Sequence, residues 1–329
     1  MADESQYVSH CSSFWNGVRV LIEDTTTTAR GGLTITACGP DVPIKCATVI
    51  KNLLFCVRDA SSCDGGNNFS SVRRVELYSL TNPRECIGAV DMPDIVLALG
   101  GSPQCVVVVT AFAALWYAPI ETFCRSAVPT LECKIPSGIK LCAICGDSIC
   151  IVANEQPLEV KVVNRITKRE IVIQSLHHAP IRAVAISSDG SKVATVSENG
   201  TVIRVWDVAC TADKPSFELR PSKYRSHVNS LAFGGPTGHV IALHCDYLSY
   251  LSLLGWPRYP MVYAFDLTKQ IPSSESWCVP GVGLHGTLLG DSTGGILRVV
   301  PGEGHQGGSG QWIVSYDVAT HQVVHEVKL

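Results

Sequence analysis

Short apolar runs, alternating with polar positions or continuous, recur along this chain and are separated by turn residues. Seven copies of one such run follow a turn and end at a polar corner. They are GVRVLIED from Gly17, VRRVELYSL from Val72, AALWYAPI from Ala113, PLEVKVVNR from Pro157, TVIRVWDV from Thr201, LSYLSLLG from Leu248 and GILRVVPG from Gly295. From the second copy onward they lie about 41 to 47 residues apart, a spacing typical of four-stranded propeller blades.

The clearest repeat contains four strand-like runs in succession, IRAVAISS, KVATVS, TVIRVWDV and PSFELR. Helical periodicity is not evident, so a doubly wound α/β fold has little support. The pattern predicts an all-β fold, a seven-bladed β-propeller of WD-repeat-like four-stranded blades forming a single domain over residues 1–329. Asn199-Gly200 predicts a two-residue hairpin within the fifth blade.

The C-terminal run QWIVSYDVATHQVVHEVKL predicts one or two strands that close the fold. They could pair inside the seventh blade or with strands around Tyr7 to Ser13, because register depends on partners that the pattern does not identify. The uncharged stretch from Ile95 to Ile120 is long enough for a membrane span. Gly100, Gly101 and Pro103 interrupt it, so buried strands joined by a turn are the better interpretation.

Composition narrows the class of protein. Hydrophobic residues make up 46% of the chain and charged residues 17%, which indicates a globular protein with a large core. A net charge of -3 argues against the broad basic surface of a nucleic-acid-binding protein. The start MADESQYVSH lacks the features of a secretory signal, so we expect a cytoplasmic protein. The 15 cysteines are expected to be reduced core thiols.

Enzymatic and metal-binding motifs find little support. Cys142 and Cys145 have CxxC spacing, but residues three apart on a strand point to opposite faces, so a zinc site is not expected. His177 and His178 have no accompanying metal-ligand cluster. The segment GEGHQGGSG lacks the ending of a phosphate loop. We therefore predict a protein that is not an enzyme, with no cofactor and no metal.

One blade gathers small hydroxyls and arginines. Thr195, Ser197, Thr201, Arg204 and Arg220 fall in or beside neighbouring strands. Arginine offers a planar fork of donors for phosphate, and hydroxyl groups can complete the shell. The same residues could instead satisfy strand ends, with Arg204 paired to a nearby acidic residue, Glu198 or Asp207. From the residues alone, both interpretations stay open.

The segment ATVSENGTVIRVW, followed by LRPSKYRSHVNSLAF, resembles the fifth blade and double-arginine motif of the PROPPIN, or WIPI-like, propellers. The resemblance implies a phosphoinositide-binding peripheral membrane adaptor that takes phosphatidylinositol 3-phosphate or the 3,5-bisphosphate in autophagy or endosomal traffic. Autophagy or trafficking proteins would be its partners, on autophagic or endosomal membranes. The implied phosphoinositide-binding residues are Arg220, Ser197, Thr201, Arg204, Thr195 and His178.

The second headgroup site of the family is degenerate here, because Pro221 and Ser222 replace the second arginine and the glycine of the motif. Residues that could contribute to it are Lys223, Arg225, His227, Asp246 and Ser249. Aromatic and apolar residues after the sixth copy could touch a membrane interface. They are Trp256, Tyr259 and Met261. The alternative function is a WD-repeat protein-protein interaction scaffold of the same fold that does not bind lipid.

Overall fold

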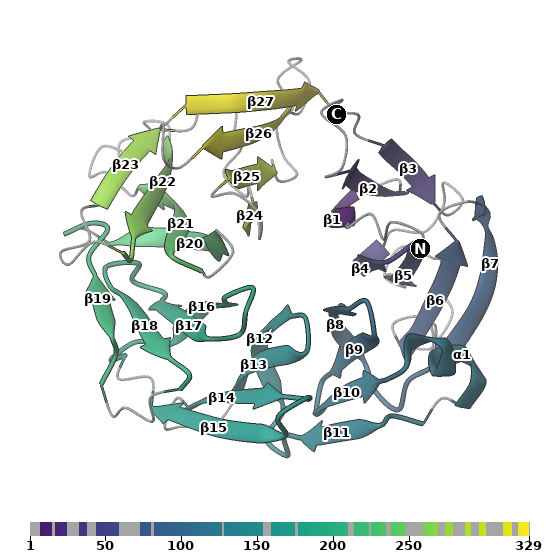
Figure 1. Ribbon diagram of the computed structural model, residues 1–329. Helices are drawn as coiled ribbons and strands as arrows, with labels where there is room; N and C mark the ends of the chain where they lie inside the picture. Colours follow the sequence, from purple (N-terminus) through teal and green to yellow (C-terminus); the bar gives the residue numbers. More distant parts are fainter. Residues whose placement is uncertain are drawn as a thin grey trace, which may run out of the picture. The chain divides into compact units, whose positions relative to one another are not determined.

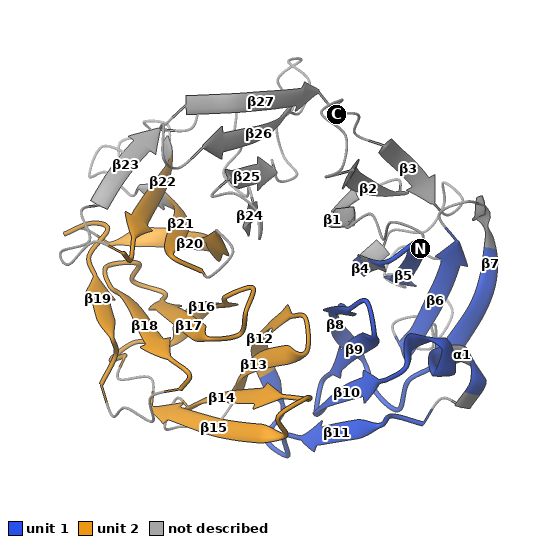
Figure 2. Cartoon of the chain, in the orientation of Figure 1, with its two compact units in different colours: residues 1–139 blue, residues 140–329 orange. Residues whose placement is uncertain are grey.

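The computed structural model describes the backbone over much of the chain, and side chains over parts of residues 46–268. The described backbone covers residues 7–14, 17–24, 33–37, 44–58, 73–79, 82–126, 128–153, 159–174, 177–209, 214–223, 225–234, 238–247, 259–268, 274–278, 287–290, 296–300, 312–317 and 322–328. The chain divides into two compact units, residues 1–139 and 140–329 (Figure 2). Their strands form antiparallel sheets of neighbouring sequence segments (Figure 1).

Unit 1 holds three sheets. The first, in the order β1-β2-β3, consists of β1 Tyr7–Phe14, β2 Gly17–Asp24 and β3 Leu33–Ala37. The second consists of β4 Ile44–Ile50, β5 Leu53–Arg58, β6 Arg74–Ser79 and β7 Asn82–Asp91. The third consists of β8 Val96–Ser102, β9 Cys105–Thr110, β10 Ala113–Tyr117 and β11 Leu131–Lys134, with a 3-10 turn Ile120–Thr122 and the short helix α1 Phe123–Ser126 before β11.

Unit 2 holds four sheets, whose strands also follow chain order. The first two consist of β12 Ile139–Cys145, β13 Ser148–Ala153, β14 Glu159–Asn164 and β15 Arg169–Gln174, and of β16 Ile181–Ile186, β17 Lys192–Ser197, β18 Ile203–Asp207 and β19 Phe217–Leu219. The last two consist of β20 Ser226–Gly234, β21 Val240–Tyr247, β22 Tyr259–Asp266 and β23 Ser274–Cys278, and of β24 Thr287–Gly290, β25 Ile296–Val300, β26 Trp312–Asp317 and β27 Gln322–Lys328.

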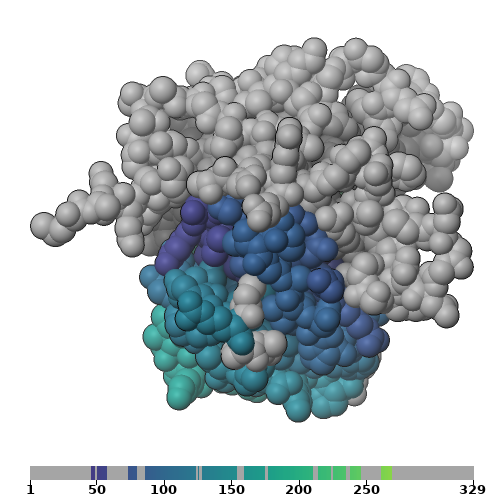
Figure 3. Space-filling model, turned by 90° about the vertical axis from the view of Figure 1, so that its right-hand side faces the viewer, coloured from purple at the N-terminus to yellow at the C-terminus, as the bar shows by residue number. Residues whose placement is uncertain are grey.

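The apolar pattern explains which strands are buried. The second strands β5, β9 and β13 carry nearly continuous apolar runs, and every residue of β9 and β10 is buried. In unit 1 these strands pack with Phe55 and Phe123 into one core cluster. In unit 2, Trp206 fills the core shared by the β12–β15 and β16–β19 sheets, since it packs with Cys150 and Val160. Figure 3 shows in purple and blue the surface that described residues of unit 1 present.

Several sequence predictions are confirmed and others are wrong. The stretch from Ile95 to Ile120 forms β8, β9 and β10, and no helix among the described residues is long and apolar enough to cross a membrane. The C-terminal run forms β26, which pairs with β25, and β27, which pairs with β26, so both strands belong to the seventh sheet. The predicted domain over residues 1–329 stays a prediction.

The seventh copy of the repeated strand does not hold the same position in its sheet as the third, fourth and fifth copies, and the sixth copy is not tested. The sixth copy, LSYLSLLG, lies outside the described residues, and β22 is the third strand of that sheet. GILRVVPG forms β25, which is a second strand, whereas β10, β14 and β18 are third strands. The misassignment arises because any apolar run fits a strand pattern, and only the pairing partners identify its place in a sheet.

Candidate functional site

The candidate site lies at the turn that joins β17 to β18. The last pair of the ladder is Val196 with Ile203, so the loop between them is longer than the predicted two-residue hairpin. Gly200 donates its N–H to the carbonyl of Ser197 at 3.0 Å, which closes a turn over Ser197–Gly200. Gly200 has φ +65°, a left-handed conformation that glycine adopts without steric cost. The turn therefore sets Thr201 beyond the ladder, at the end of the sheet where Ser197 lies.

Arg204 lies in the middle of a row of polar side chains that crosses the sheet. It is directly opposite Thr195 on β17 and Glu218 on β19. Its Nε donates to Glu218 Oε1 at 2.9 Å, and its side chain is only 13% exposed. The sequence candidates for its partner were Glu198 and Asp207, but Asp207 pairs with Lys192 at 3.2 Å. The acceptor is instead the cross-strand residue, which only the strand register reveals.

His177, which precedes β16, completes this row. Its Nε2 lies 2.9 Å from Thr195 Oγ1, and its Nδ1 lies 2.8 Å from the Arg204 guanidinium. Thr195 is fully buried, so its hydroxyl serves the histidine and not the solvent. His177 is a residue that the sequence prediction missed in favour of His178, which is exposed. Adjacent histidines give no signal for which imidazole turns inward.

Burial, reinforced by the positive charge of Arg204, lowers the pKa of His177 to about 4. Because this value lies below the ordinary pKa of about 6.5, folding favours the neutral ring. Its contribution to stability is therefore complete above about pH 6.5 and is lost as the pH falls toward 4. We expect the free energy of unfolding to fall between pH 7 and pH 5 by about 1 to 2 kcal/mol more in the wild type than in His177→Gln. Denaturant titrations at both pH values measure this, and equal losses in both proteins would contradict it.

A second row lies one step closer to the turn. Ser197 ends β17 two residues after Thr195, and Arg220 follows Glu218 by two residues. Residues two apart along a strand face the same side of a sheet, so the register predicts Ser197 and Arg220 on the face that carries Arg204. Ser197 is mostly buried, whereas Arg220 is exposed and makes no ion pair with a described residue. Arg220 is thus an available cation beside a fixed network.

After Arg220 the chain crosses to β20, the first strand of the next sheet. Ser226 donates its N–H to the carbonyl of Asn199 at 3.2 Å, so the crossing segment rests on the turn. Pro221, which stands where the resemblance would place a second arginine, is buried. Lys223 and Arg225 are exposed on the crossing segment. Position 221 therefore has no positive charge, and the cations that follow Arg220 in this segment are Lys223 and Arg225.

Other predicted residues are partly outside the description. His227 is exposed on β20 and lies directly opposite the backbone of Asp246 on β21. Ser249 and Trp256 lie outside the described residues, and of Tyr259 only the backbone is described. Met261 is half-buried and packs against the apolar core of its sheet.

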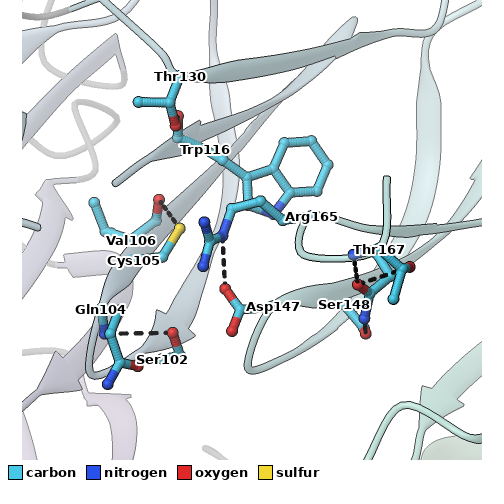
Figure 4. Close-up of polar contacts among 11 residues, drawn as sticks. Ser102, Gln104, Cys105, Val106, Trp116, Thr130, Asp147, Ser148, Arg165 and Thr167 are labelled. Atoms are coloured by element: carbon cyan, nitrogen blue, oxygen red, sulfur yellow. Dashed lines mark hydrogen bonds and ion pairs between the residues drawn. The ribbon is translucent and has the colours of Figure 1, made fainter. Parts of the chain in front are cut away.

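Not every arginine near a turn is available for a ligand. In the β12–β15 sheet, Arg165 Nε donates to Asp147 Oδ1 at 2.7 Å, and both side chains are largely buried (Figure 4). The backbone N–H of Arg165 also bonds the carbonyl of Asp147, so the pair fixes a turn. This arginine is structural. In contrast, Arg220 is exposed and has no carboxylate partner among the described residues, and these two features distinguish the candidate site.

The cysteine pair expected to be core thiols is partly buried. Burial raises the pKa of Cys142 and of Cys145 to about 11, so both thiols are protonated near neutral pH. Cys145 packs against the core cluster that contains Trp206. Within the described part of the chain, no group of three or more His, Cys, Asp or Glu residues could hold a metal ion.

This chain has relatives by sequence and relatives by structure among known proteins. No family model matches the chain. Autophagy-related protein 18 of Scheffersomyces stipitis is 30% identical over 97 residues, which are 30% of this chain but only 17% of that protein. Autophagy-related protein 18 of Vanderwaltozyma polyspora is 40% identical over 89 residues, which are 27% of this chain and 16% of that protein. The matches therefore span less than a fifth of the length of these curated relatives.

Among solved structures, the complex of KlAtg21 with the coiled coil of AgAtg16 matches 98% of this chain and 96% of that chain, with TM-score 0.69 and 14% identity. Hsv2 of Kluyveromyces lactis matches 99% of this chain and 96% of that chain, with TM-score 0.62 and 14% identity. At this identity the structures show the fold. The chain is thus a seven-bladed β-propeller with Atg18 proteins among its sequence relatives, and its predicted resemblance to the PROPPIN family is confirmed.

Proposed function

We propose that this chain is a binding protein and not an enzyme, and that Arg220 binds the phosphate of a 3-phosphorylated inositol lipid. Its function is that of a peripheral adaptor on cytoplasmic membranes in autophagy or endosomal traffic. The observation that carries the proposal is an exposed guanidinium without an ion-pair partner among the described residues, beside the Ser197–Gly200 turn. Guanidinium groups bind phosphate through paired, charge-assisted hydrogen bonds. The Atg18 relatives support the assignment to autophagy.

The neighbouring residues divide into ligands and supports. Thr201 is half-buried at the turn, and in this proposal its hydroxyl completes the phosphate shell beside Arg220. Arg204 is held by Glu218 and His177 through two of its nitrogens, so it contributes charge from a fixed position. Thr195 contributes indirectly by holding His177. A rigid supporting network lowers the entropy lost when the ligand binds.

A single arginine contributes only limited affinity for a membrane. A charge-assisted hydrogen bond contributes about 1.5 to 3 kcal/mol, and a second linked headgroup site would raise avidity by about a hundredfold or more. Since Pro221 supplies no cation, we expect weaker membrane binding than in relatives with two intact arginines. Surface electrostatics should make the binding sensitive to salt.

Liposome flotation tests the proposal. The wild type should float with vesicles that contain phosphatidylinositol 3-phosphate or the 3,5-bisphosphate, and less with vesicles that lack them. Arg220→Ala should reduce the bound fraction about tenfold or more, because the lost contact is charge-assisted. Arg169→Ala is a matched control, since Arg169 is an exposed arginine on β15 of the same unit.

Equal flotation of wild type and Arg220→Ala with both kinds of vesicle would overturn the lipid assignment. The interaction scaffold without lipid binding would then be the better function. The coiled-coil partner of the KlAtg21 structure makes a protein partner a reasonable second role, which adaptor and scaffold share.

A further inference from the structure

Arg182 occupies an irregular position in the first strand of the fifth blade. The pairing of β16 with β17 shifts register between Ile181 and Ala183, so Arg182 is an extra residue outside the regular ladder. Such bulges turn a side chain away from the direction that the ladder would give it. Arg182 is exposed. The bulge therefore presents a guanidinium at the edge of the sheet.

The same bulge recurs in other first strands of the chain. Register shifts occur at Lys45 in β4, at Leu97 in β8 and at Asn229 in β20. These positions carry a cation, an apolar residue and an amide, so the bulge itself does not require arginine. A structural role common to the blades thus fails to explain why Arg182 is an arginine.

The Arg182 side chain makes few contacts that would stabilise the fold. Its Nε donates to the carbonyl of Val228 on β20 at 3.4 Å, which is a long hydrogen bond. It makes no ion pair within the described part of the chain, although the exposed Glu198 follows Ser197, the backbone partner of Ile181. Most of its donors are therefore available to a ligand.

A second arginine lies close to the same edge. Arg225 directly precedes Ser226, which bonds Asn199 of the turn, and Val228 lies within 3.1 Å of a Cβ built on Gly200. The segment from Arg225 to Val228 thus runs beside the turn, and Val228 contacts Arg182. Arg225 is exposed and has no ion-pair partner among the residues described. The two arginines approach the turn from the β16 side and the β20 side.

Acidic residues near this edge reduce the positive potential of the two arginines. Glu198 is exposed in the turn, and the backbone of Asp246 lies opposite His227 on the neighbouring strand β21. His227 bonds Asn229 through Nδ1 at 3.1 Å and is not required as a ligand. Among the side chains that the structure describes here, the two arginines face only the carboxylate of Glu198, so this edge is locally cationic in a chain whose net charge is -3.

We propose that Arg182 and Arg225 form a second phosphate-binding position at the edge shared by β16 and β20. It takes a phosphate group, from a second lipid headgroup or from free phosphate. The proposal rests on the proposed function for the nature of the ligand, but it uses neither Arg220 nor the degenerate motif position. In this arrangement a bulge in β16 and the crossing segment supply the cation that Pro221 does not.

Two measurements test this position. Flotation at fixed ionic strength compares wild type, Arg182→Gln, Arg225→Gln, the double variant and Arg220→Ala, on vesicles of neutral lipid with or without phosphatidylinositol 3-phosphate. Isothermal titration with inorganic phosphate tests the soluble source. Arg169→Gln is the control for loss of an exposed arginine, Arg182→Lys tests the need for a fork of donors, and thermal unfolding verifies that each variant is folded.

For a lipid source, we expect the double variant to bind vesicles with the phosphoinositide about tenfold more weakly than wild type, while Arg182→Lys recovers only part of the loss. Glu198→Gln should strengthen binding, because it removes the opposing charge. For a soluble source, the double variant should lose the heat of phosphate binding while vesicle binding is unchanged. Either result supports the position.

Wild-type behaviour of the folded double variant in both measurements would overturn the inference. If Arg220→Ala still loses vesicle binding in that case, the proposed function stands and only this second position fails. If instead the double variant weakens binding and Arg220→Ala does not, the proposed role of Arg220 fails and the second position stands.

Discussion

Gly200→Ala is expected to destabilise the protein by about 2 to 4 kcal/mol. Gly200 has φ +65°, which costs a non-glycine residue energy. A Cβ at this position would also lie 2.6 Å from Ser226 Oγ and 2.8 Å from the Ser226 carbonyl oxygen. The backbone contact cannot be relieved by a side-chain rotation, so the turn and the crossing segment must separate. Denaturant titration measures the loss.

The chain offers a matched control for this substitution. Gly146 has φ +55°, but a Cβ built there meets no atom within 4 Å. Gly146→Ala should therefore cost only the conformational term, about 1 kcal/mol. Ser226→Ala combined with Gly200→Ala should restore part of the lost stability, since it removes one of the two close contacts. Equal losses in the two glycine variants would show that the packing against Ser226 is unimportant. At a temperature where Gly200→Ala is still folded, we also expect weaker flotation, because the turn carries Thr201.

Trp206→Ala should have the largest effect on stability, about 3 to 5 kcal/mol. The side chain is 2% exposed and fills the core shared by the β12–β15 and β16–β19 sheets. Its indole Nε1 is buried and has no hydrogen-bond partner among the described residues. An unsatisfied buried donor costs free energy in the folded state. Trp206→Phe should therefore cost little, from about zero to 1 kcal/mol, because the smaller ring loses contacts but removes the unpaired donor.

Thermal and denaturant unfolding of both tryptophan variants provide the measurement. A loss in Trp206→Phe close to that in Trp206→Ala would mean that the indole nitrogen is satisfied in the folded protein. The distinction matters for the site, since Trp206 lies two residues from Arg204 on β18. A variant that unfolds cannot report on ligand binding, so Trp206→Phe is the suitable background for changes at this core.

The fold could be predicted from the sequence because strand patterns and turn residues are local. β14 and β18 fall where their apolar runs predicted them, and the period of the repeat fits the sheets of unit 2. The position of each strand within its sheet could not be predicted in the same way. β25 resembles a third strand in pattern but pairs as a second strand, because pairing depends on long-range partners.

The candidate site shows the same limit at the level of single residues. Arg220 could be identified as a cation from the motif that carries the family resemblance. The partner of Arg204 could not, because Glu218 is near it only across the β18–β19 ladder. Arg182 was not predicted as a site residue, since an arginine at the start of an apolar strand looks like an ordinary surface position. Its exposure depends on a bulge, and a bulge leaves no clear mark in a single sequence.

The recurring bulge in β4, β8, β16 and β20 also has a consequence for how such a protein can change. A residue outside the ladder can be exchanged without disturbing the pairing of the residues on either side. Lysine, leucine, arginine and asparagine at Lys45, Leu97, Arg182 and Asn229 indicate that this freedom is used. Each of these sheets thus has one bulge position where the side chain can change with little loss of stability. Evolution or protein engineering could use this position to introduce a new binding residue.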